Sequence, residues 1–146
     1  MKNSYKLLIL LLLPLISFGY NFKNEDAYTK EKNISKSFTV DADALLQTSN
    51  SYGNINVYLW DENKISIQVN IKVSGKNENA VTEKLNAIDV EFSASDSRVN
   101  AITTFENSSK NGNNMNFEIN YIIKIPKNGS VALVNKYGDI AIEKLN

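Results

Sequence analysis

Two short acidic segments are the first candidates for chemistry in this sequence. Asp41 and Asp43 flank one alanine, and Asp61 and Glu62 precede an asparagine. Such side chains could bind a cation, but a calcium loop needs about six or more converging oxygen ligands and a glycine at its bend, and neither segment supplies them. We therefore interpret both segments as carboxylates in solvated turns. The sequence predicts no metal site and no cofactor.

The residue types that most enzymes depend on are missing. The sequence contains no histidine and no cysteine, and no Gly-x-Ser-x-Gly segment. The commonest general base, the usual activator of a serine nucleophile and the commonest transition-metal ligand are therefore absent. Two of the 16 acidic residues could still meet in space and hydrolyse a sugar bond, which spacing alone does not decide. We predict that the protein is not an enzyme and has no catalytic residues.

Two aromatic residues form a candidate binding surface. Within residues 54–60, Tyr58 and Trp60 lie on one face of an expected strand, opposite its aliphatic residues and next to a turn. Aromatic side chains in such a place can form a platform for a sugar ring or a protein partner. The alternative, which we favour, is that both faces of this strand are covered, one of them by a helix near residues 77–88.

A short motif occurs twice, 85 residues apart, as NSYGNINV at residues 50–57 and NKYGDIAI at residues 135–142. The structural turn residues are Tyr52, Gly53, Tyr137 and Gly138. Glycine adopts positive φ without a Cβ clash, so we expect a sharp turn between two strands in each copy. If the copies stack, equivalent side chains lie ~4.8 Å apart and the two tyrosines form one aromatic stack. The alternative is an ordinary hairpin turn that occurs twice.

The elements that must position these residues are mostly strands. Residues 64–73, KISIQVNIKV, place five aliphatic side chains on one face in strict alternation. Residues 116–126 also alternate, with Phe117, Ile119, Tyr121, Ile123 and Ile125 on one face, and Pro126 should close that strand because it cannot donate a ladder hydrogen bond. Between residues 77 and 88 the apolar residues instead recur at helical spacing. The pattern predicts a mainly β fold of stacked sheets, with eight to ten short strands and one short helix lying on a sheet.

The beginning of the chain is typical of an exported protein. Residues 1–19 combine two lysines, an apolar segment shorter than the ~20 residues of a membrane span, and small residues near Gly19, which is the layout of a signal peptide. A retained membrane anchor is the alternative, and we disfavour it because polar sequence begins at Tyr20. We expect a flexible lead over residues 20–35 and a β domain over residues 36–146.

Charge and cysteine content restrict the partners and the source of stability. Without residues 1–19 the chain keeps 14 basic and 16 acidic side chains. A nearly neutral chain has no sequence-wide attraction to phosphate, so we expect no nucleic-acid partner. An exported domain without cysteine must be stabilised by core burial alone, and about 127 residues are enough for one such core.

Residues 44–146 resemble a bacterial family of exported proteins known as "putative adhesins", related to the head domain of autotransporter adhesins. The resemblance rests on YGNINV, ISIQVNIKV, LNAIDVEF and NYIIKIPKNGSVALVNKYGDIAI. In that family a Tyr-x-Ile-x-Ile-Pro segment, here residues 121–126, is followed by many Gly-Asp-Ile or Gly-Asp-Val repeats. The resemblance implies the start of a right-handed β-solenoid, with the helix near residues 77–88 as an insertion. Because only one such repeat follows here, we expect a β domain truncated at its C-terminal end, with an open strand edge at residues 139–146 through which the chain could self-associate.

The same resemblance implies a function. It suggests an adhesin-like protein of the envelope or surface of a Gram-negative bacterium, or a secreted one, which binds a protein or glycan and meets the membrane only during export. The alternative is a periplasmic structural or sensing module linked to envelope stress signalling. A carbohydrate-binding domain is a further, weaker alternative.

Overall fold

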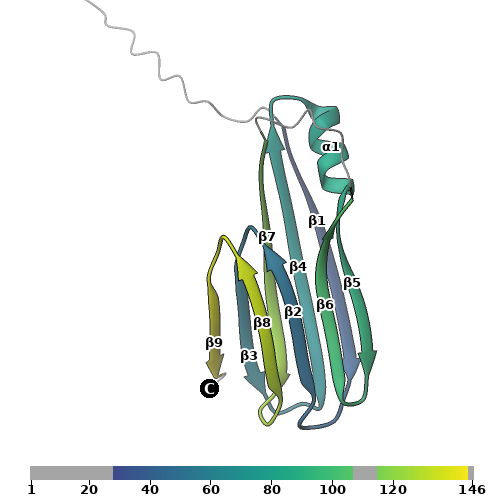
Figure 1. Cartoon of the computed structure of the whole chain (residues 1–146), viewed down its shortest axis with the longest axis vertical. Coiled ribbons are helices and arrows are strands. Elements are labelled where there is room, and N and C mark those ends of the chain that lie inside the picture. The colour runs from purple at the N-terminus through teal and green to yellow at the C-terminus, as the bar shows by residue number, and fades with distance from the viewer. Residues whose placement is uncertain (1–27, 107–114, 145–146) are drawn as a thin grey trace, which may run out of the picture.

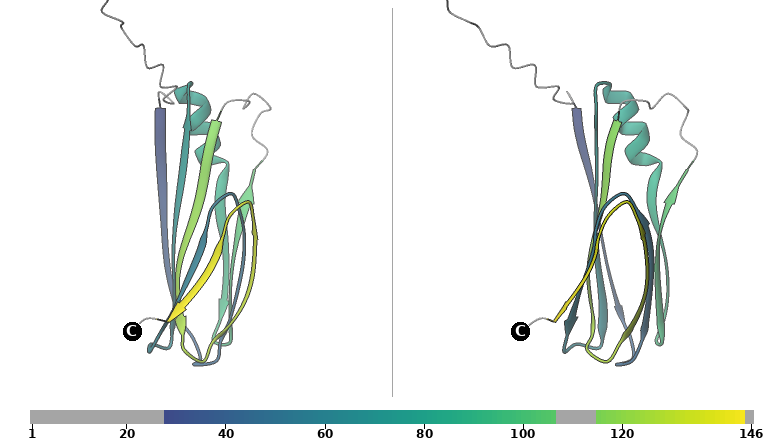
Figure 2. Two further views of the ribbon diagram at one scale, coloured as in Figure 1. Left: turned by 90° about the vertical axis from the view of Figure 1, so that its left-hand side faces the viewer. Right: turned by 60° about the vertical axis from the view of Figure 1, so that its left-hand side comes forward.

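A computed structural model describes residues 28–106 and 115–144. Within these ranges nine β-strands and one α-helix form two sheets that lie face to face (Figures 1 and 2). The prediction of a mainly β fold with one short helix is confirmed. The predicted signal peptide, residues 1–19, lies outside the described residues.

The larger sheet has five strands in the order β1-β4-β7-β3-β9. These are β1 (Tyr28–Thr39), β4 (Lys64–Gly75), β7 (Met115–Pro126), β3 (Ile55–Trp60) and β9 (Ile140–Lys144). β4 is antiparallel to both β1 and β7, whereas β3 is parallel to both β7 and β9. The sheet therefore has three long antiparallel strands on one side and two short parallel strands on the other.

The smaller sheet has four strands in the order β5-β6-β2-β8. These are β5 (Ile88–Ser95), β6 (Arg98–Phe105), β2 (Leu45–Ser51) and β8 (Ser130–Lys136). β5 and β6 pair antiparallel, whereas β2 is parallel to both β6 and β8. Both sheets thus end, on the same side of the molecule, in strands contributed by the repeated motif (Figure 1).

The core lies between the sheets and follows the alternation of the sequence. The five aliphatic residues predicted to share one face of β4 are all buried, namely Ile65, Ile67, Val69, Ile71 and Val73. On β7, Ile119, Tyr121 and Ile123 are fully buried. Burying a side chain of this size stabilises the fold by about 1.5–3 kcal/mol. The two strands with the clearest alternation therefore form the centre of the core.

The predicted helix is confirmed as α1 (Glu78–Asn86). Asn77 caps its first turn, because its side-chain oxygen accepts a hydrogen bond of 3.0 Å from the backbone N–H of Ala80. Val81 and Leu85 are buried. The helix packs mainly on β4 and β1, at the end where these strands extend beyond the smaller sheet (Figure 1). It covers core residues there that the smaller sheet does not reach.

The flexible lead predicted for residues 20–35 is wrong for residues 28–35, which belong to β1. β1 is an edge strand whose inward positions include Lys30 and Lys32, so it lacks an alternating apolar pattern. Lysine can occupy such positions because its aliphatic stem packs while its ammonium group reaches a polar partner.

The partners of these two lysines lie on the elements opposite β1. The Lys30 ammonium group lies 3.0 Å from the Glu78 carboxylate of α1. The Lys32 ammonium group lies 3.2 Å from the Asp89 carboxylate and donates a hydrogen bond of 3.0 Å to the carbonyl of Ile88. These contacts of Lys30 and Lys32 help to hold β1 in place, and no local sequence pattern predicts them.

Candidate functional site

The two copies of the repeated motif are stacked side by side. β2 pairs with β8 and β3 with β9, and in both pairs each residue lies beside its equivalent 85 positions later, such as Asn50 beside Asn135 and Ile55 beside Ile140. Both copies pass from the smaller sheet to the larger one at their turn, as the adjacent arches in Figure 2 show. The alternative of two ordinary hairpin turns is therefore wrong, because β2 does not pair with β3 in either sheet. We call β2–β3 the first unit and β8–β9 the second unit.

Backbone hydrogen bonds continue through the turns. Tyr52 donates its N–H to the carbonyl of Lys136 at 2.8 Å, and Gly53 donates to the carbonyl of Tyr137 at 3.2 Å. The first unit is attached to β7 in the same way, since Ile119 donates to the carbonyl of Tyr52 at 2.7 Å. β7, the first unit and the second unit are consequently three successive layers.

Asparagine side chains join the same three layers through one repeated contact. The Asn120 side-chain oxygen on β7 accepts the backbone N–H of Asn54 at 2.9 Å. The Asn54 side-chain oxygen in turn accepts the backbone N–H of Asp139 at 2.9 Å. β7 and the first unit therefore each offer one side-chain oxygen to the backbone of the next layer.

A second repeated contact involves the asparagine before each turn. Asn50 Nδ2 donates to the carbonyl of Ile119 at 2.9 Å, and Asn135 Nδ2 donates to the carbonyl of Gly53 at 2.7 Å. Each amide thus reaches across to the backbone of the preceding layer. This explains why the motif has asparagine at the same position in both copies.

The glycines are required mainly because successive layers approach closely. A Cβ atom on Gly53 would lie 2.1 Å from the carbonyl oxygen of Ile119. On Gly138 the nearest atom, the carbonyl oxygen of Gly53, would be only 1.8 Å away. From the sequence we expected glycine to supply the positive φ of the turn. Gly53 does have a φ of 151°, but the residue in the left-handed region of both turns is the tyrosine before it.

Tyr52 and Tyr137 adopt φ angles of 66° and 59°, which are unusual for residues with a bulky side chain. Such a conformation costs on the order of 1–3 kcal/mol and tends to occur at functional sites. Their rings stack as the repeat predicts, with centroids 5.0 Å apart and an angle of 20° between the planes. The strained backbone therefore holds two tyrosine rings side by side at the surface.

Two phenylalanines extend this pair into a cluster of four aromatic rings. The ring of Phe117 lies 4.7 Å from that of Tyr52, and the ring of Phe105 lies 6.4 Å from it. The ammonium group of Lys84 lies over Phe117, 4.5 Å from the ring centroid. Tyr52 is 42% exposed and Tyr137 75% exposed. Contiguous apolar surface of this kind can mark an interaction site.

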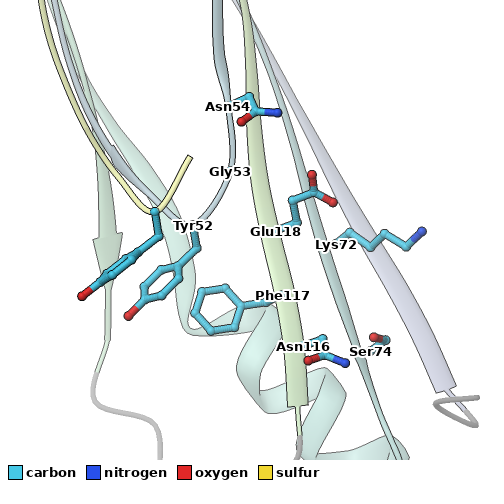
Figure 3. Close-up of a pocket in the computed structure, with 9 residues that line it drawn as sticks. Tyr52, Gly53, Asn54, Lys72, Ser74, Asn116, Phe117 and Glu118 are labelled. Carbon is cyan, nitrogen blue, oxygen red and sulfur yellow. The ribbon is translucent and has the colours of Figure 1, made fainter. Parts of the chain in front are cut away.

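A depression of about 460 Å³ lies beside the aromatic cluster (Figure 3). Its aromatic lining is Tyr52, Phe117 and Tyr137, and its polar lining includes Asn54, Lys72 and Glu118. We call it the tyrosine groove. In Figure 3, Tyr52 and Phe117 lie on one side of β7, and Glu118 and Lys72 lie on the other side. The lining of the groove therefore has an aromatic side and a polar side.

A buried network of hydrogen bonds holds the asparagine that precedes the first turn. The Tyr121 and Thr103 hydroxyls lie 2.7 Å apart, and Thr103 donates to the Asn50 side-chain oxygen at 2.9 Å. Burial raises the pKa of Tyr121 to about 12, which the hydrogen bond with Thr103 partly opposes. The network fixes Asn50 in the orientation that reaches β7. Sequence reasoning missed it, because its members come from three strands and share no local pattern.

The aromatic residues predicted as a binding surface, Tyr58 and Trp60, do not line the groove. Both are half-buried on β3. Trp60 donates its indole N–H to the carbonyl of Lys64 at 2.8 Å, and the Lys124 ammonium group lies 5.4 Å from its ring centroid. The expected cover of this strand by the helix is wrong, because α1 packs mainly on β4 and β1.

The acidic segments lie in turns and bends. Asp61 forms an ion pair with Lys127, in the connection between β7 and β8. Asp41 donates its backbone N–H to the carbonyl of Asp96 at 2.7 Å. Across residues 28–106 and 115–144, no three histidine, cysteine or acidic side chains are grouped so that they could hold a metal ion.

The fold and the groove define a two-sheet β protein with a stacked repeat and an exposed aromatic cluster. Two solved structures are similar to part of this chain. A "putative cell adhesion protein" from Clostridium sporogenes is 12% identical, with a TM-score of 0.45, and the similarity covers 77% of this chain and 51% of that one. A "putative adhesin" from Bacteroides fragilis is 15% identical, with a TM-score of 0.41, covering 77% of this chain and 44% of that one.

The chain thus spans about half the length of the two solved proteins that it resembles. No known family profile matches the sequence, and no curated protein matches it either. In the part of the chain that the structure describes, no helix is both long and apolar enough to cross a membrane.

Proposed function

We propose that this chain is an exported, adhesin-like binding protein without enzymatic activity, and that its ligand occupies the tyrosine groove. The observation that carries the proposal is the stacked pair of exposed tyrosine rings, both held in a left-handed backbone conformation. Such a conformation has a cost, and a turn built from asparagine or glycine would avoid it. If the two tyrosine rings bind the ligand, their function explains why this unfavourable backbone conformation is kept.

The chemistry of the groove favours a glycan as its ligand. The apolar face of a sugar ring packs against aromatic side chains, and its hydroxyl groups bond to amide, carboxylate and ammonium groups. Tyr52 and Tyr137 supply the first kind of contact, and Asn54, Lys72 and Glu118 supply the second. A protein ligand that inserts an aromatic or aliphatic side chain is the alternative outcome of a binding test.

The stacked units also support the view that this domain is the start of a β-solenoid at the cell surface. The two units share their register, their asparagine contacts and their turn, and a longer stack would repeat the same arrangement. A rigid stack of this kind presents outward side chains that are free to vary, which suits recognition more than catalysis. Export would follow from the predicted signal peptide, residues 1–19.

A glycan panel tests the proposed ligand. Tyr137→Asn removes the ring and suits the left-handed backbone, so the fold should persist, and Tyr58→Ala on β3 is the matched control. Loss of one sugar–aromatic stack should weaken binding about tenfold, corresponding to ~1.4 kcal/mol. If both variants bind a glycan with equal affinity, the glycan binds outside the groove. If no glycan binds but a protein does, the ligand is a protein.

Location is tested separately in the producing cell. A cell-surface protein should be digested when protease is added to intact cells, whereas a periplasmic protein should be protected until the outer membrane is opened. Protection in intact cells would favour a periplasmic role and contradict the surface role.

A further inference from the structure

The outer face of the larger sheet carries a row of amide side chains. Asn33 of β1, Asn70 of β4 and Asn120 of β7 lie side by side in the strand register. Asn54, which precedes β3, continues the row, because its backbone N–H donates to the Asn120 side-chain oxygen at 2.9 Å. No helix or strand of the described chain covers this face (Figure 2). We call these four residues the asparagine row.

Hydrogen bonds within the asparagine row orient its amides and leave polar groups for a ligand. Asn70 Nδ2 donates to the side-chain oxygen of Asn33 at 2.8 Å and to the Glu31 carboxylate at 3.3 Å. The Asn70 oxygen and the Asn33 nitrogen take no part in these bonds. Gln68, two residues before Asn70 on the same face of β4, is exposed and adds a further amide. Side chains that are already oriented lose less conformational entropy when they bind a ligand.

A shallow depression of about 350 Å³ lies over the row. Asn33, Asn70 and Asn120 line it, together with Gln68. Ile122, which is beside Gln68 in the register, also lines it and is 46% exposed. The depression therefore combines several amides with one aliphatic contact.

The charge around the depression favours an uncharged ligand. Within the described chain, no charged side chain lines it. On the next row along the strands, the Lys72 ammonium group lies 3.8 Å from the Glu31 carboxylate, and Glu118 is beside Lys72 in the register. A charged ligand would gain most from an unpaired charge of the opposite sign, and these residues already pair with each other.

The depression continues the polar side of the tyrosine groove. Asn54 lines the groove and Asn120 lines the depression, and these two residues are joined by the hydrogen bond of 2.9 Å. Glu118, which also lines the groove, is two residues from Asn120 on the same face of β7, a distance of about 7 Å along the strand. The groove and the depression are therefore neighbouring parts of one surface.

We propose that the asparagine row binds successive sugars of a linear, uncharged glycan whose first ring packs in the tyrosine groove. This rests on the proposed function and deepens it, because it names the class of glycan. Amides both donate and accept hydrogen bonds, as sugar hydroxyls do. The amides recur at the strand spacing of ~4.8 Å and so suit a ligand whose hydroxyl groups recur along a chain. Ile122 provides a contact for the apolar face of a ring.

An extended peptide fits the asparagine row less well. A peptide that adds to a sheet gains most of its affinity from backbone hydrogen bonds with an edge strand. β4 and β7 lie inside the sheet, and each is paired with a strand on both sides. Their backbone groups are therefore already used, and only side chains are left to bind a ligand on this face.

The test measures how affinity depends on glycan length. The full chain is titrated by calorimetry with cello-, chito- and manno-oligosaccharides, each from the disaccharide to the hexasaccharide. In at least one of these series we expect the hexasaccharide to bind about tenfold or more tightly than the disaccharide, since two further hydrogen bonds of ~1 kcal/mol each become possible. Gln68→Ala and Asn33→Ala should each weaken hexasaccharide binding about fivefold and leave disaccharide binding unchanged.

Two controls separate this inference from the proposed function. Gln47→Ala changes a half-buried glutamine on β2 of the smaller sheet and should change neither affinity. Tyr137→Asn should weaken the disaccharide and the hexasaccharide equally, because it acts on the groove. If Tyr137→Asn weakens binding but affinity does not depend on length, the groove binds a short glycan, and only the further inference is wrong.

Three other results would overturn the further inference. The first is a dependence on length that Gln68→Ala and Asn33→Ala leave unchanged. The second is tighter binding of an acidic series, such as oligogalacturonates, than of every neutral series. The third is absence of glycan binding, including the case in which a peptide binds and Gln68→Ala weakens it.

Discussion

Replacing Gly53 by alanine is the sharpest test of the layered arrangement. Gly53 has a φ of 151°, and its new Cβ would lie 2.1 Å from the oxygen and 2.6 Å from the carbon of the Ile119 carbonyl. These atoms belong to the backbone of β7, in the middle of the larger sheet, so neither side can move at low cost. The first unit would have to shift away from β7.

The shift would break at least two hydrogen bonds. These are the bond from Ile119 N–H to the carbonyl of Tyr52 and the bond from Asn50 Nδ2 to the carbonyl of Ile119. Each is worth about 1 kcal/mol net, and more if a buried group remains unpaired. With about 1–3 kcal/mol of backbone strain, we expect Gly53→Ala to lower the free energy of unfolding by ~3–5 kcal/mol.

Urea unfolding followed by circular dichroism measures this loss, with Gly129→Ala as the matched control. A Cβ on Gly129 would meet its nearest atoms, the carbonyl oxygens of Ala44 and Pro126, at 3.1 Å. A small adjustment relieves that contact, and alanine also restricts the unfolded chain, so we expect a change below ~1 kcal/mol. If Gly53→Ala is no more destabilising than Gly129→Ala, the close contact between layers does not carry the stability that we assign to it.

Three further predictions concern buried or paired polar groups. Burial raises the folded-state pKa of Tyr121 to about 12, so the neutral hydroxyl should contribute its full stabilisation below about pH 10. The free energy of unfolding should then fall by ~3 kcal/mol as the pH rises towards 12. Urea unfolding of Tyr121→Phe should not show this fall. The Val90 N–H and then the Lys32 ammonium group lower the pKa of Asp89 against opposing desolvation, so its contribution should be present above about pH 4 and lost in more acidic solution; Asp89→Asn should flatten acid unfolding curves over that range. Asn50→Ala should cost ~2–3 kcal/mol in urea unfolding because it leaves buried partners unpaired, and a cost below that of an exposed substitution such as Asn63→Ala would contradict this.

The long core strands and the helix could be predicted because their information is local. In β4 and β7 every second residue is apolar over most of the strand, and in α1 Val81 and Leu85 recur at helical spacing after the capping residue Asn77. Side chains of this kind must leave water, and the spacing alone decides which face they occupy. The repeated motif was equally visible, and with it the stacking of Tyr52 on Tyr137.

Other features depended on contacts between distant residues. β1 resembled a flexible lead because its inward positions carry Lys30 and Lys32, whose partners lie on α1 and β5, far along the chain. The tyrosine groove could not be found from sequence, because Phe117 joins Tyr52 only when β7 and the first turn lie side by side. Tyr58 and Trp60 were the better candidates by sequence only because they are neighbours in the chain.

The sequence by itself therefore determined the core strands, the helix and the equivalence of the two turns, since each depends on the spacing of residues along one segment. The tertiary structure decided which of these strands lie together, and hence where the aromatic cluster forms and which aliphatic side chains stay exposed. Ile55 and Ile140 are equivalent in sequence, yet Ile55 is buried and Ile140 is exposed. The difference arises because β9 lies beside β3 and covers Ile55. Ile140 lies on β9 itself, at the edge of the sheet, where no strand of the described chain lies on its outer side.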